Sequence, residues 1–248
     1  MFISASFLKI NYGIDEMIAA FFVDREPPVD NLYWKGKLLY LRPTPGYLFI
    51  PLIVDLLYKL GIDRKQLLSE EFVGVMEQVG HISALEETGE ITVDDAIQRC
   101  SDLVKDSCKN KRWHSSLLDF LYNGESNFFN PLSIPFKALH RGDLFLFSLS
   151  VLEFTSDMGD KIAEYWFALI STLLLLDDVE DIETDTKTGQ PNAFLESGFD
   201  AAGIETIFEW VRRSVERLAT LNQTMAHELH EQFTQLVNQP HILKRLNR

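Results

Sequence analysis

The hydrophobic positions of the chain repeat at helical spacing, and no run alternates long enough to predict a strand. The clearest apolar face has successive separations of 3, 1, 3, 4 and 3 residues and comprises Ile204, Ile207, Phe208, Val211, Val215 and Leu218. Further helices are expected over 14–23, 45–60, 63–85, 92–108, 113–122, 133–154 and 222–237. The pattern predicts an all-α, single-domain helical bundle over residues 1–248, with about ten helices around one core.

The chain is organised around the stretch 162–185, which is expected to be its central helix. The first part of this stretch is apolar nearly all round, which is typical of a helix buried in a core. Six carboxylates then follow within nine positions: Asp177, Asp178, Glu180, Asp181, Glu183 and Asp185. The residues at 188–191, Thr-Gly-Gln-Pro, form a strong helix stop. The carboxylates are therefore expected in the last turns of this helix.

Asp177, Asp181 and Asp185 lie at i, i+4 and i+8, so they share one face of the expected helix. Like charges at this spacing repel by about 0.2–0.5 kcal/mol per exposed pair, and carboxylates at a helix C-terminus also oppose the macrodipole. A cation bound between them would relieve both penalties, and carboxylate oxygens suit Mg²⁺ or Mn²⁺. The alternative interpretation is a solvated acidic surface at the end of a helix.

Charge and cysteine content narrow the class of protein. A net charge of −14 argues against nucleic acid as the main partner, because phosphate binding requires clustered Lys and Arg. Cys100 and Cys108 are about 12 Å apart along one expected helix, too far for a disulfide, which favours a reducing cytoplasm. The N-terminus lacks the basic region of a signal peptide. The longest mainly apolar run, 165–176, is shorter than the ~20 residues that span a bilayer. A soluble cytoplasmic protein without a transmembrane segment is expected.

Histidine and arginine provide further candidates for a site. His227 and His230 are i, i+3 neighbours that could share a metal with Glu231, although a polar helix face is the simpler interpretation. His140 and Arg141 fall within the expected helix 133–154, which is otherwise rich in Leu and Phe. A charge in such a helix is costly unless it is paired. Arg141 is therefore predicted to pair with an anion or with the Asp cluster, and a purely structural ion pair stays open.

The sequence DDVED at 177–181 is a DDxxD motif at the end of an apolar helix. In an all-α protein this motif resembles the class I isoprenoid synthases, which are the trans-prenyl diphosphate synthases and terpene cyclases. In that family, helices surround an apolar cavity, and Asp-rich motifs hold Mg²⁺ ions that bind the diphosphate of the substrate. The stretch 173–192 is similar to the second Asp-rich motif of the prenyl diphosphate synthases. The resemblance implies four candidate metal ligands: Asp177, Asp178, Asp181 and Asp185.

The resemblance also implies basic residues that contact the diphosphate. The segment GKLLYLRP at 36–43 is loosely similar to the family's basic diphosphate-binding segment. The family's Gly-Lys-Pro turn is Gly-Gln-Pro here, with a lysine close by. The candidate diphosphate contacts are Lys37, Arg42, Arg141 and Lys187. The chain departs from the family where its first Asp-rich motif is expected, because Glu86 and Glu87 stand in place of the Asp pair.

The carboxylate pattern predicts a site for Mg²⁺ or Mn²⁺, and the resemblance implies that the ligand bound with the metal is a prenyl diphosphate. Metal-assisted loss of diphosphate, as in a prenyltransferase or a terpene synthase, is the reaction that the resemblance implies. The rival hypothesis is a non-catalytic acidic interaction protein, either a degenerate synthase subunit or an immunity-type protein that masks a basic partner. A homodimer or a complex with a partner subunit is compatible with both hypotheses.

Overall fold

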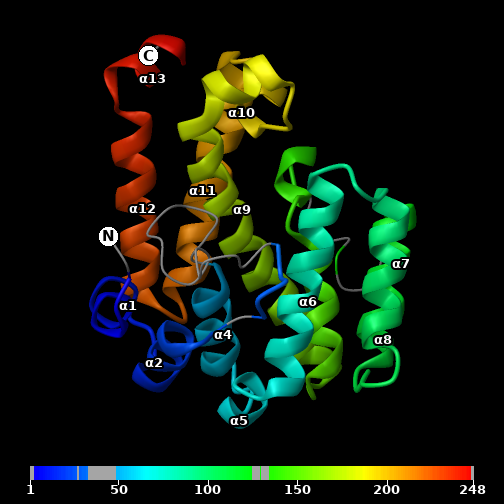
Figure 1. Ribbon diagram of the computed structural model, residues 1–248. Helices are drawn as coiled ribbons and strands as arrows, with labels where there is room; N and C mark the ends of the chain where they lie inside the picture. The colour runs from blue at the N-terminus through cyan, green and yellow to red at the C-terminus, as the bar shows by residue number, and fades with distance from the viewer. Residues whose placement is uncertain (1–2, 27, 33–48, 125–128, 130–133, 247–248) are drawn as a thin grey trace.

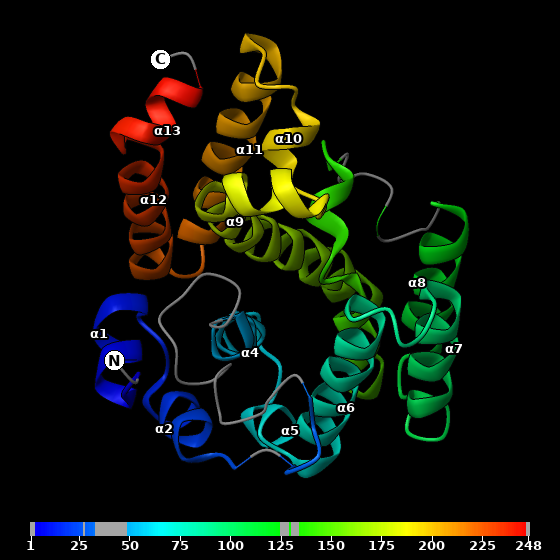
Figure 2. The ribbon, with the colours of Figure 1, turned by 45° about the horizontal axis from the view of Figure 1, so that its top comes forward.

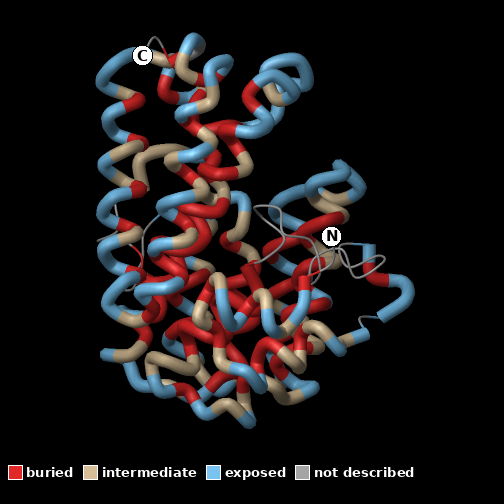
Figure 3. The backbone as a smooth tube through the Cα atoms, turned by 90° about the vertical axis from the view of Figure 1, so that its left-hand side faces the viewer, coloured by how far each residue is buried: buried red, intermediate tan, exposed pale blue. Residues whose placement is uncertain are grey.

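The computed structural model describes residues 3–26, 28–32, 49–124, 129 and 134–246. Within these ranges every regular element is a helix, and none is a strand, so the all-α prediction is confirmed for the part of the chain that the structure describes. The helices enclose one continuous apolar core, and Figure 3 shows the buried residues along their inward-facing sides.

The long helix α9, Ser156–Thr188, is the central element that the sequence predicts. Thr155 caps its start by accepting a hydrogen bond from the N–H of Met158, and Gly189 ends it in the left-handed conformation at φ 73°. The Gly189 N–H closes the last turn on the carbonyl of Asp185 at 2.8 Å. Both ends of the helix are thus fixed by local signals.

Helices from both halves of the chain surround α9 (Figure 1). It packs against α4, Phe49–Lys59, and against the antiparallel pair α11, Ala201–Ala219, and α12, Gln223–Val237. Its C-terminal end contacts the short α10, Ala193–Glu196. In Figure 2, α4 is seen nearly end-on. The helix α9 runs obliquely between α4 and the helices α10 and α11.

The remaining helices of the N-terminal half are short except for one. They are α1 (Ala5–Tyr12), α2 (Glu16–Asp24), α5 (Arg64–Leu67), α6 (Glu70–Glu87), α7 (Val93–Val104) and α8 (Lys111–Asn123). The single helix expected over 63–85 is therefore two, because Ser69 provides a second N-cap for α6. The helix expected to reach Cys108 ends at Val104, and α1, α10 and the C-terminal α13 (Pro240–Arg245) were not predicted.

The helix expected over 133–154 is wrong in type. The described part of this segment forms two 3₁₀ helices, η3 at Lys137–His140 and η4 at Asp143–Val151. Two η4 carbonyls accept hydrogen bonds from distant parts of the chain. Trp113 Nε1 donates to Leu146 O at 3.0 Å, and the N–H groups of Lys109 and Asn110 donate to Ser150 O at 2.9 and 3.0 Å. Tertiary contacts therefore compete for the carbonyl groups that an α-helix would use.

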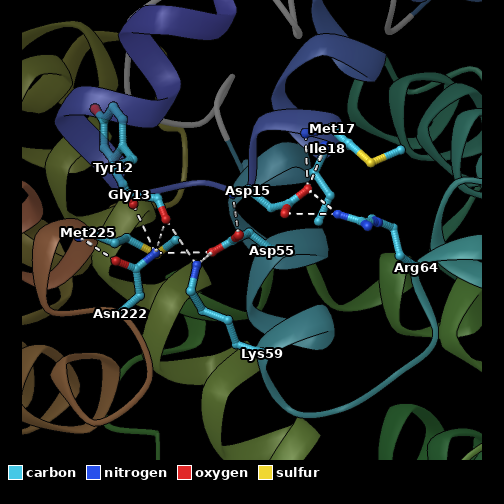
Figure 4. A network of polar contacts seen from close by, with 10 residues as sticks. All are labelled: Tyr12, Gly13, Asp15, Met17, Ile18, Asp55, Lys59, Arg64, Asn222 and Met225. Atoms are coloured by element: carbon cyan, nitrogen blue, oxygen red, sulfur yellow. Dashed lines mark hydrogen bonds and ion pairs between the residues drawn. The ribbon is translucent and has the colours of Figure 1, made fainter.

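A buried polar network ties the first helices of the chain to the last ones (Figure 4). The fully buried Asp55 of α4 accepts hydrogen bonds from the N–H of Asp15 at 2.8 Å and from Asn222 Nδ2 at 3.0 Å, and it pairs with Lys59. Asn222 Nδ2 also donates to the carbonyl of Tyr12 at 2.9 Å. Residues 167 positions apart in the sequence are thus joined around one carboxylate.

Within the described ranges, no helix combines the length and the apolar character needed to cross a bilayer.

Candidate functional site

The Asp-rich end of α9 divides its carboxylates between the inside and the outside of the protein. Successive side chains on a helix point about 100° apart, so neighbours in sequence face different surroundings. Asp178 is fully buried, whereas 42% of the Asp177 side chain is exposed and Asp181 is exposed. The four Asp residues that the sequence groups together are therefore not equivalent.

Both oxygens of the Asp178 carboxylate have partners. Oδ1 accepts a hydrogen bond from Arg141 Nη2 at 2.7 Å, and Oδ2 accepts one from the N–H of Ala193 at 2.7 Å. Burial raises the pKa of Asp178 to about 6, although Arg141 and the Ala193 N–H both favour the charged form. This carboxylate joins α9 to the start of α10 and to the corner between η3 and η4.

Asn192 holds the segment that follows α9 against its last turns. Its Nδ2 donates to the carbonyl of Asp178 and to Oδ2 of Asp185, both at 2.8 Å. Its Oδ1 accepts from the N–H groups of Phe194 and Leu195, which caps α10. Asp185 is therefore partly engaged, and the turn after Gly189 is fixed by an asparagine that the sequence analysis overlooked, although its N-cap position before an apolar pair was a usable signal.

Arg141 lies at the corner between η3 and η4 and reaches the Asp-rich end from a different part of the chain. Nη1 donates to the carbonyl of Pro191 at 2.6 Å, and Nη2 lies 3.6 Å from Asp177 Oδ2. The structural ion pair left open by the sequence is thus present, with Asp178 as its main partner. The same guanidinium also stands beside the more exposed Asp177.

Asp177 and Asp181 form the open face of the cluster. Neither accepts a hydrogen bond from the residues that the structure describes. Burial raises the pKa of Asp177 to about 7; Arg141 opposes this shift, and the neighbouring carboxylates, Asp181 foremost, add to it. Two carboxylates one helical turn apart are therefore available to a cation. Their mutual repulsion adds to the rise in the pKa of Asp177 that burial causes.

The other predicted site residues are distributed as follows. Lys37 and Arg42 lie outside the described residues. Lys187 is exposed in the last turn of α9. Glu86 and Glu87 occupy the last turn of α6, where burial and the adjacent Glu87 raise the pKa of Glu86.

Glu77, upstream on the same helix, is buried and forms a two-point ion pair with Arg25, at 2.8 Å from Nε and 2.9 Å from Nη2. His81 Nδ1 accepts a hydrogen bond from the N–H of Leu32 at 3.1 Å. Glu77 and His81 therefore hold Arg25 and the backbone of Leu32 against α6.

Metal ligands from protein side chains alone are scarce. His227, His230 and Glu231 are exposed on α12. Among the described residues, no group of three or more His, Cys, Asp or Glu side chains is arranged to hold a metal ion. A cation at the open face of the Asp cluster would therefore need ligands beyond the protein, such as water or phosphate oxygens.

A His–Asp pair beside Arg141 was not predicted from the sequence. His140 Nδ1 lies 2.6 Å from Oδ2 of the buried Asp143, while Asp143 Oδ1 has no hydrogen-bond partner among the residues that the structure describes. Burial raises the pKa of Asp143, and His140 opposes that shift. The i, i+3 spacing of the two residues was the only sequence signal, and that spacing is common.

Two shallow surface depressions lie elsewhere, over α11. One is lined by apolar side chains of α11 and α12, including Phe208, Phe233 and Val237, and the other lies around Trp210. Neither is lined by the Asp-rich end of α9 or by Arg141.

No family model, no curated protein and no solved structure matches this chain.

Proposed function

We propose that this chain binds a prenyl diphosphate together with Mg²⁺ or Mn²⁺ at the Asp-rich end of α9, on an isoprenoid-synthase-like helical scaffold. One observation carries the proposal: Asp177 and Asp181 are available one turn apart, next to an arginine that is already fixed in place. The two carboxylates provide hard oxygen ligands, and Arg141 provides a cationic contact for phosphate oxygens.

The chemistry of the donor set fits such a metal. Mg²⁺ retains several waters and is usually bound through one or two carboxylates plus the phosphates of a substrate, rather than by a cage of protein ligands. Two carboxylates without a third protein ligand agree with this mode. Burial is the main cause of the raised pKa of Asp177, and a cation here would reduce the repulsion from neighbouring carboxylates that adds to it. When bound, the metal supplies a Lewis acid and a charge sink for the diphosphate.

The rest of α9 suits the apolar part of such a ligand. The residues that precede the cluster, among them Phe167, Ile170 and Leu173, are buried and apolar. A prenyl chain is hydrocarbon, so it gains free energy from leaving water for such surroundings. These side chains are packed in the core against neighbouring helices, so a hydrocarbon chain would reach them only if those helices moved apart.

Binding is better supported than turnover. In isoprenoid synthases a second metal-binding arm faces the first, and the corresponding region of this chain carries Glu86 and Glu87 in α6. Mg²⁺ requires near-ideal octahedral geometry at about 2.0–2.1 Å, so a longer side chain moves the ion. A misplacement of about 1 Å can reduce the rate on the order of 10²-fold.

The experiment measures the melting temperature with Mn²⁺ and geranyl, farnesyl or geranylgeranyl diphosphate, and with each component alone. The protein is expected to melt higher with both components present, since a ligand at 100 times its Kd adds about 2.7 kcal/mol if it binds only the native state. The double variant Asp177→Asn, Asp181→Asn should lose the rise.

The matched control is Asp157→Asn, Asp160→Asn, which removes two exposed carboxylates from the first turns of the same helix and should keep the rise. An equal rise in the wild type and in both double variants would contradict a site at the Asp cluster. Release of pyrophosphate in the same mixtures would establish turnover.

A non-catalytic acidic interaction protein is the second candidate. The observation that favours it is that Asp178 and Asp185 are already engaged by protein groups, so part of the motif serves the fold without a metal. Exposed Glu180, Asp181 and Glu183 would then form an acidic surface for a basic partner. No response to metal with any of the three diphosphates would favour this candidate.

A further inference from the structure

The corner between η3 and η4, residues 137–143, is fixed to α9 and α10 at several points. Glu196 of α10 accepts hydrogen bonds from the N–H groups of Lys137 at 2.8 Å and Ala138 at 3.0 Å. Gly142 lies so close to α9 that a Cβ at this position would be 3.0 Å from Ile170 Cγ2. The backbone that carries Arg141 therefore has little freedom to move.

The side chain of Arg141 is fixed as well. Asp178 Oδ1 and the carbonyl of Pro191 each accept one hydrogen bond from it, at 2.7 and 2.6 Å. A guanidinium has five N–H donors, so these two bonds leave three without a partner among the described residues. The side chain is 28% exposed and lies beside Asp177, so the remaining donors are available next to the open face.

Asp178 is poorly suited to bind a metal itself. Its side chain is fully buried, and each of its oxygens already accepts a hydrogen bond from a protein donor. A hydrated cation at this carboxylate would have to displace Arg141 or the N–H of Ala193 from a buried position, which would leave a polar group unpaired. Asp181 meets no such obstacle, and Asp177 has only the longer contact of 3.6 Å with Arg141.

We infer that Asp178 is a positioning residue: it holds the Arg141 guanidinium where it contacts the diphosphate and does not ligate the metal. This inference rests on the proposed function. It divides the DDxxD motif into two roles, with Asp177 and Asp181 facing the cation and Asp178 acting through Arg141. The motif alone assigns all three residues to the metal.

A double-mutant cycle tests the inference. Binding of inorganic pyrophosphate in the presence of Mn²⁺ is measured by calorimetry at 10 °C for the wild type, Asp178→Asn, Arg141→Gln and the double variant. Each single variant is expected to weaken pyrophosphate binding about tenfold, the lower range for a hydrogen bond to a charged group. The double variant should bind no more weakly than either single one, because both changes remove the same contact.

The affinity for Mn²⁺ alone is the second readout. If Asp178 only stabilised the fold, its replacement would weaken the binding of Mn²⁺ and of pyrophosphate together. Asp178→Asn should bind Mn²⁺ as the wild type does, whereas Asp181→Asn should lose it. If Asp178→Asn does not fold, Arg141→Lys provides the test. Lysine keeps the charge but not the two-point attachment, so Arg141→Lys should bind pyrophosphate more weakly than the wild type and no more weakly than Arg141→Gln.

Loss of Mn²⁺ binding in Asp178→Asn would overturn the inference, and so would additive effects in the cycle or full binding by Arg141→Lys. These failures differ from failure of the proposed function, in which the wild type itself would bind neither Mn²⁺ nor pyrophosphate.

Discussion

Arg141 and Asp178 are joined by a hydrogen bond of 2.7 Å between Nη2 and Oδ1, although they lie 37 positions apart in the sequence. The carboxylate is fully buried, whereas 28% of the Arg141 side chain is exposed. The helix rotates by about 100° per residue, so Asp178 points into the protein, where Arg141 engages it, and Asp177 and Asp181 are left on the open face.

Replacement of Arg141 is expected to destabilise the protein. Arg141→Met keeps most of the apolar stem but leaves the buried Asp178 without its cation. Breaking a buried pair in this way costs about 3 kcal/mol. Urea unfolding without metal should show the loss. Arg213→Met is the control, since Arg213 is exposed on α11 and its replacement should change stability by less than about 0.5 kcal/mol. Equal effects of the two changes would contradict the structural role of Arg141.

The raised pKa of Asp177 predicts a pH dependence of stability. Between the ordinary value of 3.8 and about 7, the native state keeps a proton that the unfolded state has lost. The contribution of this group to stability therefore falls as the pH rises through that window. Asp177→Asn cannot ionise, so its stability relative to the wild type should increase from pH 4 to pH 7. Urea titrations at four pH values measure the difference. Asp160→Asn serves as the control, and a constant difference for Asp177→Asn would refute the prediction.

Mn²⁺ affinity should depend on the same proton. Metal binding requires the carboxylate to be deprotonated, so protons compete with the ion below the pKa of Asp177. The affinity of the wild type for Mn²⁺ is therefore expected to rise from pH 5.5 to pH 7.5 and then level off. Calorimetric titration at fixed ionic strength measures it. An affinity that stays flat across this range would place the metal at carboxylates of ordinary pKa.

The network around Asp55 predicts a strong effect at Asn222. Asn222→Ala removes a hydrogen bond to the buried Asp55, one to the carbonyl of Tyr12 and the cap of α12 at the Met225 N–H. The expected loss of stability is about 3 kcal/mol, from an N-cap and unsatisfied buried groups together. Asn238→Ala, at the exposed opposite end of the same helix, should lose less than about 1 kcal/mol. A similar loss for both variants in urea unfolding would show that the network contributes little.

Glu77 offers a comparison of a buried with a surface ion pair on one helix. Glu77→Gln weakens the two-point contact with Arg25, which itself is only 13% exposed, and about 2 kcal/mol of stability should be lost. Glu71→Gln on the same helix breaks an exposed pair with Lys109 and should cost less than about 1 kcal/mol. Guanidinium unfolding of the two variants measures the difference, and a larger loss at Glu71 would reverse the interpretation of α6.

The sequence by itself determined the helical class, the position of the central helix and its end. These features depend on local information: the apolar period from 162 to 176, the caps, and the glycine that permits φ 73° at position 189. The helix α11 was found for the same reason, because its apolar face repeats at helical spacing over 204–218.

Only the tertiary structure decided what the carboxylates do. The motif presents Asp177 and Asp178 as equivalent, but one is partly exposed and the other is buried and bound to Arg141 and the N–H of Ala193. The 3₁₀ form of 143–151 has the same origin, since Trp113 and the N–H groups of Lys109 and Asn110 take carbonyls that an α-helix would use. Contacts between residues distant in sequence leave no periodic pattern in the sequence. Which charged side chains are buried, and with which partners, therefore depends on the packing of the whole chain.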